Sequence, residues 1–330
     1  MNLRPVQALR AKPASWPSPT LLRGERLLDP ASRSAYSSFG ATVAVAVVAI
    51  AIVRLRFGGL ITVTVFASGA WLVISAWLLR RLGWPRTATA VEVTTLTYVQ
   101  GVAYLILTYS CAALSPCPLA DGALARADSF LGFDWRRAYD MIESHRWAIG
   151  PASTAYTSFD WQPLLVVPAL AAAGLSRRAW QLLLATNWTL AATCILFILL
   201  PAAGAYPHAH LVASPTAAAS PATWNAATAL HLIRDEGARH ISPDLITGLV
   251  TFPSFHAAAA VLFSWAVWPI RVLRWPVAFL NIAMAAAAVP IGGHYLVDVI
   301  GGVLIAYAAV WLSAGTSLRD HRAYSHSAVR

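Results

Sequence analysis

The chain has 330 residues, of which 58% are hydrophobic and only 12% charged, and its formal net charge is +10. Because a soluble domain carries about 25% charged residues, this composition excludes an ordinary soluble protein and indicates a membrane protein. The basic residues lie between apolar runs and form no cluster with interleaved aromatic residues, which argues against a nucleic acid partner and favours a role in membrane orientation.

Residues 1–38 are polar and basic and contain no apolar stretch typical of a cleavable signal peptide, so they predict a cytoplasmic tail. Apolar runs long enough to approach or cross a bilayer follow, and they predict an all-α, polytopic transmembrane bundle of about eight spans. These runs are 39–53, 60–79, 94–115, 153–175, 179–202, 254–270, 272–292 and 294–315. We expect 39–115 to form the N-terminal transmembrane helices and 317–330 a second cytoplasmic tail.

The distribution of basic residues predicts the orientation of the bundle. If the N-terminus is inside, the inner connections hold about twice as many basic residues as the outer ones, as the positive-inside tendency requires. Most acidic residues then fall in the outer connections. The sequence therefore predicts a multi-pass protein of the cell membrane with both termini in the cytoplasm.

Two of the outer connections are long. Segment 116–152 interleaves apolar with charged residues, which is typical of an amphipathic helix in the membrane interface, although a solvated loop is the alternative. Segment 203–250 is either a flexible loop or a lid that contacts the substrate. Cys111 and Cys117 lie close enough in sequence to pair in an oxidising compartment, but buried free cysteines are common and the sequence does not decide between these states.

The candidate chemistry lies where two of the apolar runs begin. His256 ends the stretch Phe252-Pro253-Ser254-Phe255-His256, and His294 begins His294-Tyr295-Leu296-Val297-Asp298. A single apolar run separates these stretches, so both histidines are expected at the outer rim of the bundle. On a helix, residues four apart share a face, which would let the Asp298 carboxylate accept the Nδ1 proton of His294 and leave Nε2 free.

The same stretches suggest an anion site. Pro253 and Ser254 favour the start of a helix, whose free N–H groups bind anions, and Ser254 adds a hydroxyl donor. Arg234 and Arg239 are basic residues in the connection that leads to His256. One histidine could then attack phosphorus while the other protonates the leaving oxygen, which indicates phosphoryl transfer with catalytic His256, His294 and Asp298.

Together, Phe252-Pro253-Ser254-Phe255-His256 and Gly293-His294-Tyr295-x-x-Asp298-x-x-Gly301 resemble the second and third motifs of the type 2 phosphatidic acid phosphatase (PAP2) superfamily. They are most similar to its inositol phosphorylceramide synthase, or inositolphosphotransferase, branch. The likeness is best over about 153–316, and a weaker likeness extends back through 131–135. A Ser-Arg pair of the wider superfamily falls here on Ala287 and Ala288, and Arg234 and Arg239 only loosely match its first motif.

This resemblance implies a six-helix catalytic core at 153–316, with His294 as the nucleophile that becomes a phosphohistidine. It also implies Asp298 as the orienting partner of His294, His256 as general acid, a lipid phosphate or phospholipid as substrate, and no cofactor or metal.

Three other readings of the histidines stay open at the level of sequence. They could be the axial ligands of a haem, or they could bind a metal ion together with Asp298. The chain could also be a transporter or a non-catalytic membrane scaffold, although it shows no inverted repeat or pair of broken helices.

Overall fold

The computed structural model describes residues 30–57, 59–211 and 218–327, so most of the expected N-terminal tail lies outside the described residues. Within these ranges the chain is predominantly helical, and this confirms the all-α class. Each of the eight apolar runs overlaps one long helix. These helices are α1 (Pro30–Val53), α2 (Gly59–Arg81), α3 (Pro85–Leu114), α6 (Ile149–Ala172), α7 (Ser176–Leu199), α10 (Phe255–Val267), α11 (Arg271–Ala287) and α12 (Leu296–Ser327).

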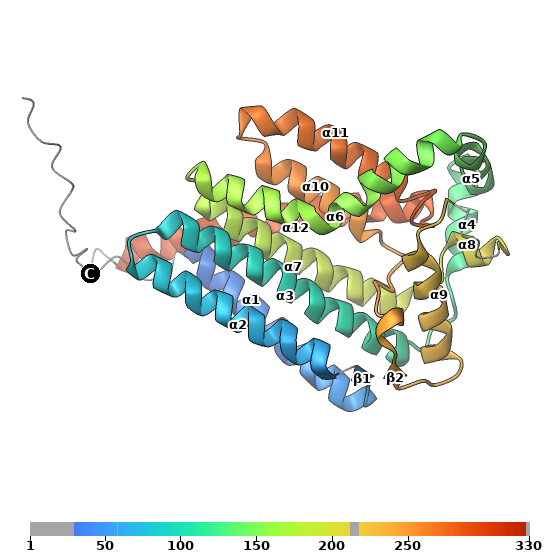
Figure 1. Ribbon diagram of the computed structural model, residues 1–330, viewed down its shortest axis with the longest axis horizontal. Helices are drawn as coiled ribbons and strands as arrows, with labels where there is room; N and C mark the ends of the chain where they lie inside the picture. The colour runs from blue at the N-terminus through green and yellow to red at the C-terminus, as the bar shows by residue number, and fades with distance from the viewer. Residues whose placement is uncertain (1–29, 58, 212–217, 328–330) are drawn as a thin grey trace, which may run out of the picture.

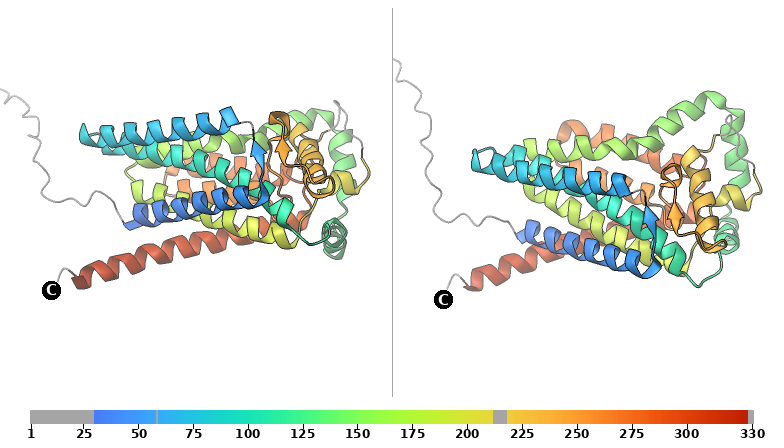
Figure 2. Two further views of the ribbon diagram at one scale, coloured as in Figure 1. Left: turned by 90° about the horizontal axis from the view of Figure 1, so that it is seen from below. Right: turned by 60° about the horizontal axis from the view of Figure 1, so that its bottom comes forward.

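The long helices run along the long axis of the molecule, and the short elements gather at one end of it, on the right in Figure 1. Figure 2 shows the same separation from two other directions. We call this end, which is built from residues 116–148, 200–211 and 218–254, the cap. Its elements are α4 (Asp121–Phe130), α5 (Trp135–Ser144), η1 (Arg146–Ala148), α8 (Ala205–His208), α9 (Pro221–Arg234), β2 (His240–Ile241) and η2 (Pro243–Leu245).

Four helices among the described residues are long and apolar enough to cross a membrane, which is consistent with membrane insertion. They are Ala31–Val53, Pro85–Leu114, Ser176–Leu199 and Leu296–Ala314. A crossing needs about 20 residues, and α10 and α11 have 13 and 17. The expected count of about eight spans is therefore not confirmed by helix length and composition.

The bundle is held together by a continuous apolar core and by a few buried polar ties. The core includes residues of α3, α6, α7, α10, α11 and α12. Near one end of it, the buried carboxylate of Glu92 on α3 pairs with Arg80 on α2 and accepts a hydrogen bond from Tyr36 on α1. The described part of α1 already includes residues before the expected start at 39, and its first turns pack against the bundle with Ala31 and Ala35 buried.

The cap is tied to the N-terminal helices as well as to the C-terminal ones. A two-residue strand β1 (Arg56–Phe57), in the turn after α1, pairs in parallel with β2, with Arg56 opposite His240. The described residues of the 203–250 segment are thus part of the cap and include the 14-residue helix α9. Cys111, Cys117 and Cys194 are free thiols, so Cys111 and Cys117 are not paired.

Candidate active site

The site forms where the first turns of α10 and α12 meet under the cap. Ser254 begins α10 as its N-cap, and its Oγ accepts a hydrogen bond from Ala257 N at 3.4 Å. Its own backbone N–H donates to the backbone carbonyl of Asp298 at 2.9 Å. The predicted helix start is confirmed, but the Ser254 side chain is fully buried and engaged in capping.

Two pairs of glycines allow the backbone to approach closely at this site. A Cβ atom on Gly302 would lie 2.1 Å from the Ser254 carbonyl oxygen, a distance that no real side chain tolerates. Gly293 has φ +69°, and a Cβ on it would lie 2.6 Å from the ring of Tyr206. The absence of a side chain at these positions therefore permits the tight helix contact at 301–302 and the bend at 292–293.

His294 lies just before α12 and not on it, because the helix begins at Leu296. The expectation that His294 and Asp298 share one face of a helix is therefore wrong, because only Asp298 lies on the helix. The Nδ1 atom of His294 lies 2.9 Å from the backbone carbonyl oxygen of Thr251 and 3.4 Å from Asp298 Oδ2. Because a carbonyl oxygen only accepts hydrogen bonds, Nδ1 must carry the proton, and the lone pair of the neutral imidazole is on Nε2.

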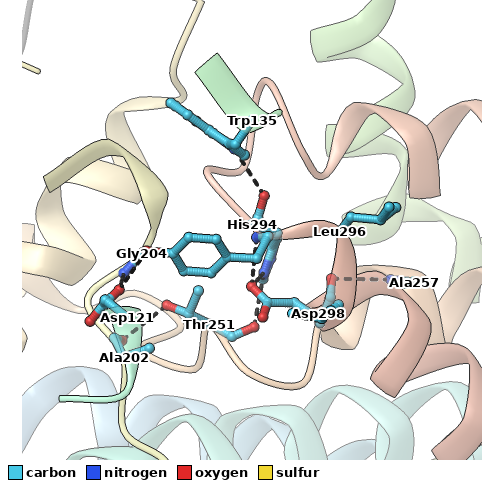
Figure 3. Close-up of polar contacts among 12 residues, drawn as sticks. Asp121, Trp135, Ala202, Gly204, Thr251, Ala257, His294, Leu296 and Asp298 are labelled. Atoms are coloured by element: carbon cyan, nitrogen blue, oxygen red, sulfur yellow. Dashed lines mark hydrogen bonds and ion pairs between the residues drawn. The ribbon is translucent and has the colours of Figure 1, made fainter. Parts of the chain in front are cut away.

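Asp298 is buried completely and supports the turn that precedes it. Its Oδ2 accepts a hydrogen bond from Tyr295 N at 2.8 Å, in addition to its contact with His294 (Figure 3). Its Oδ1 has no hydrogen-bond partner among the described residues. The carboxylate therefore lies beside Nδ1 of His294 as predicted, although the Thr251 carbonyl, which the sequence reasoning missed, is the nearer acceptor.

His256 faces His294 across the rim. The centroids of the two rings are 6.3 Å apart, although 37 residues separate them along the chain. Tyr156 of α6 stacks on His256 with a centroid distance of 4.0 Å and an interplanar angle of 14°, and Phe159 packs against the same ring at 4.8 Å. Tyr156 was not identified as a site residue from the sequence, because an aromatic residue in an apolar run carries no signal of its partner.

The two arginines expected to bind phosphate make other contacts. Arg234 ends α9, and its Nη2 donates to the carbonyl of Cys117 at 2.6 Å. Arg239 donates to the carbonyl of Ala238 at 3.0 Å. Thr223, at the other end of α9, is the part of that helix that approaches Gly293. At about 1.5 Å per residue, Arg234 lies roughly 16 Å farther along the helix, so these contacts do not bring the arginines to the histidines.

The acidic groups of the cap next to the site are shielded from solvent. Burial raises the pKa of Asp128, and hydrogen bonds from the N–H groups of Leu296 and Val297 partly offset this shift. Burial also raises the pKa of the Tyr295 hydroxyl, and the neighbouring Asp121 carboxylate adds to the effect. Among the residues that the structure describes, no group of three His, Cys, Asp or Glu side chains could hold a metal ion.

Comparison with protein families identifies a match within the C-terminal two thirds of the chain. The model of the PAP2 superfamily matches residues 122–312, more than half of the chain, and the match includes both histidine motifs and the 131–135 stretch. No curated protein and no solved structure matches the chain significantly. The match does not identify the inositol phosphorylceramide synthase branch. The chain belongs to the PAP2 superfamily, whose members are generally phosphatases or phosphotransferases.

Proposed function

We propose that the protein is a multi-pass membrane enzyme that moves a phosphoryl or phosphoalcohol group from a lipid through a covalent intermediate on His294. The observation that carries this proposal is the 6.3 Å separation of the His256 and His294 rings, together with the Thr251 carbonyl at Nδ1 of His294. Hydrogen bonds reach about 3 Å, so one phosphoryl group between the rings could contact both.

In the first step, Nε2 of His294 attacks phosphorus and forms an N–P bond. The bond from phosphorus to the leaving oxygen breaks, and a protonated His256 gives its proton to that oxygen. The Thr251 carbonyl and Asp298 stabilise the positive charge that develops on the His294 ring, because both lie at its Nδ1 side. The positive end of the α10 dipole lies at the same rim and favours the phosphate oxygens.

In the second step, His256 accepts a proton from the incoming hydroxyl, whose oxygen attacks phosphorus as the N–P bond breaks. The electron pair of that bond returns to Nε2. Water as the acceptor gives a phosphatase, and an alcohol, such as the hydroxyl of a second lipid, gives a transferase. The likeness of the motifs to the inositolphosphotransferase branch favours the transferase.

We also propose that about eight helices cross the cell membrane, with the cap and the site on the extracytoplasmic face and both termini in the cytoplasm. A membrane-impermeant maleimide would test this in intact cells, in a Cys117→Ser background. Glu236→Cys in the cap should be labelled in intact cells. Arg271→Cys, in the connection between α10 and α11 at the end of the bundle away from the cap, should be labelled only after the cells are opened. The reverse pattern would place the site on the cytoplasmic face.

The catalytic proposal is tested with purified protein and a panel of phospholipids and isoprenoid phosphates, with released phosphate and new lipid products as readouts and vanadate as inhibitor. Substrate labelled in its phosphoryl group should leave acid-labile label on the wild-type protein. We expect His294→Ala to remove both label and turnover and Asp298→Asn to abolish turnover. His256→Ala should slow departure of the leaving group. His231→Ala is the matched control, because His231 is exposed and bonds only to Asp235 and Glu236.

Full activity in the His294 variant would rule out the phosphohistidine mechanism. Arg234→Gln tests the predicted phosphate contact separately, since a specific rise in KM would support that role and an unchanged KM would reject it. Product without free phosphate would identify a transferase.

A further inference from the structure

The helix α4 and the residue Trp135 contact the backbone around His294 from the cap. Asp128 accepts hydrogen bonds at both carboxylate oxygens, from Leu296 N and from Val297 N, each at 2.9 Å. The indole Nε1 of Trp135 donates to the backbone carbonyl of His294 at 3.1 Å (Figure 3). Asp128 and Trp135 are 2% and 8% exposed, so these bonds are sheltered from competing water.

A second carboxylate on α4 anchors the neighbouring loop. Asp121 Oδ2 accepts a hydrogen bond from Ala203 N at 2.9 Å, and its Oδ1 accepts one from Gly204 N at 2.8 Å. The Tyr295 hydroxyl donates to the same Oδ1 at 3.1 Å. Asp121 and Asp128 are seven residues apart, which is about two helical turns, so they project from the same face of α4.

These bonds matter because the His294 segment lacks regular structure of its own. Residues 293–295 are not helical, and the first N–H groups of a helix have no acceptor within that helix. Asp128 supplies acceptors for two of those N–H groups from a distant part of the chain. Trp135 fixes the carbonyl of the nucleophile itself, so the backbone on both sides of Tyr295 is bound to the cap.

We propose that Asp128 and Trp135 are positioning residues that hold the His294–Val297 backbone at the angle required for attack on phosphorus. The catalytic consequence rests on the function proposed above. Neither residue touches the reacting atoms, so their loss should lower kcat and leave KM within about twofold. Displacement of a nucleophile by about 1 Å can cost two orders of magnitude in rate, and we expect a 10- to 100-fold loss of kcat for Asp128→Asn.

The variants are chosen to keep the fold. Asp128→Asn preserves shape but turns one acceptor oxygen into an NH₂ group that faces a backbone N–H. Trp135→Phe keeps an aromatic ring against Tyr139 and Tyr206 but removes the indole donor. Asp134→Asn is the matched control: its carboxylate is half exposed and contacts only Arg137 within α5.

Two readouts separate this proposal from the proposed function. The first is kcat and KM on the best lipid substrate. The second is hydrogen–deuterium exchange of the Leu296 and Val297 amides in detergent, which does not depend on activity. For Asp128→Asn we expect exchange about tenfold faster at these amides, with unchanged exchange in α3 and α7 and no change in the Asp134 variant.

Each outcome decides the proposal. Faster exchange together with lower kcat at constant KM supports it, and wild-type exchange or kcat within twofold overturns it. If the wild-type protein transfers no phosphoryl group, the proposed function fails, and the exchange measurement alone decides whether Asp128 holds this segment. If Asp128→Asn does not fold, Trp135→Phe decides by the same two measurements.

Discussion

The close approach of α10 and α12 at Gly302 makes a quantitative prediction. Helix α10 carries His256, and α12 begins two residues after His294. The backbone N–H of Ser254, the N-cap of α10, donates a hydrogen bond to the backbone carbonyl of Asp298 on α12. A Cβ on Gly302 would lie 2.1 Å from the Ser254 carbonyl oxygen and 3.1 Å from its carbon. Ordinary contact begins at 3.4 Å, so Gly302→Ala leaves a deficit of 3.4 − 2.1, or 1.3 Å. The opposing atoms belong to backbone, and no side-chain rotation relieves the overlap.

The first turns of the two helices must therefore separate by about 1 Å in the Ala variant. Overpacking of this kind costs about 1–3 kcal/mol of stability. If the two histidines act as proposed, a shift of about 1 Å between them can lower kcat by about 100-fold. We expect Gly302→Ala to fold in the membrane and to lose activity far out of proportion to its loss of stability.

The assay compares kcat and the thermal unfolding midpoint of Gly302→Ala with those of Gly101→Ala. Gly101 is the matched control because it lies within the long helix α3 and a Cβ there meets nothing within 4 Å. Alanine favours helix over glycine by up to about 1 kcal/mol, so this control should be neutral or slightly stabilised. A Gly302 variant with wild-type midpoint and kcat would refute the claim that the backbone contact sets the geometry of the site.

Two further substitutions test other contacts. In Gly292→Ala, the new Cβ would lie 2.7 Å from the Ala288 backbone oxygen and 2.8 Å from both the ring and the hydroxyl of Tyr156. We therefore expect the turn to shift, the ring to leave its stack and kcat to fall about tenfold. An unchanged rate would show that the stack is not needed. Arg80→Ala leaves the Glu92 carboxylate buried without its cation, and we expect a loss of about 3 kcal/mol in chemical unfolding. Arg81→Ala, which only uncovers Trp77, should change stability by less than 1 kcal/mol.

The positions of the long helices could be predicted from the sequence because hydrophobic run length is a local property. Each of the eight runs overlaps a helix, but the predicted helix starts are less accurate. Helix α3 begins at Pro85, nine residues before the expected run, because Thr89 and Glu92 are buried by packing against other helices. Polar residues that find partners only in the assembled bundle carry no hydrophobic signal, so a sequence reading places them in loops.

In the candidate site, too, the contacts that form only in the folded chain could not be predicted from the sequence. The proximity of His294 and Asp298 follows from their spacing, but it arises in a turn capped by Asp298 and not along a helix. The Thr251 carbonyl could not have been found, because any residue supplies a backbone oxygen. Asp121 and Asp128 did leave a signal, two acids on one face of an otherwise mixed helix, but their partners are 82 or more residues away in sequence and only the fold identifies them.

The distance between the two histidines is set mainly by backbone atoms. Ser254 N bonds to the Asp298 carbonyl, Thr251 O accepts from His294 Nδ1, and Gly302 lets the two chains approach within these limits. Backbone groups on packed helices do not change rotamer, so these contacts fix the separation of the two rings, as the proposed transfer between them requires. Preorganisation of this kind avoids the cost of reorganising the site during the reaction. It also accounts for Gly302, where a side chain would take the space that the contact between the two helix starts requires.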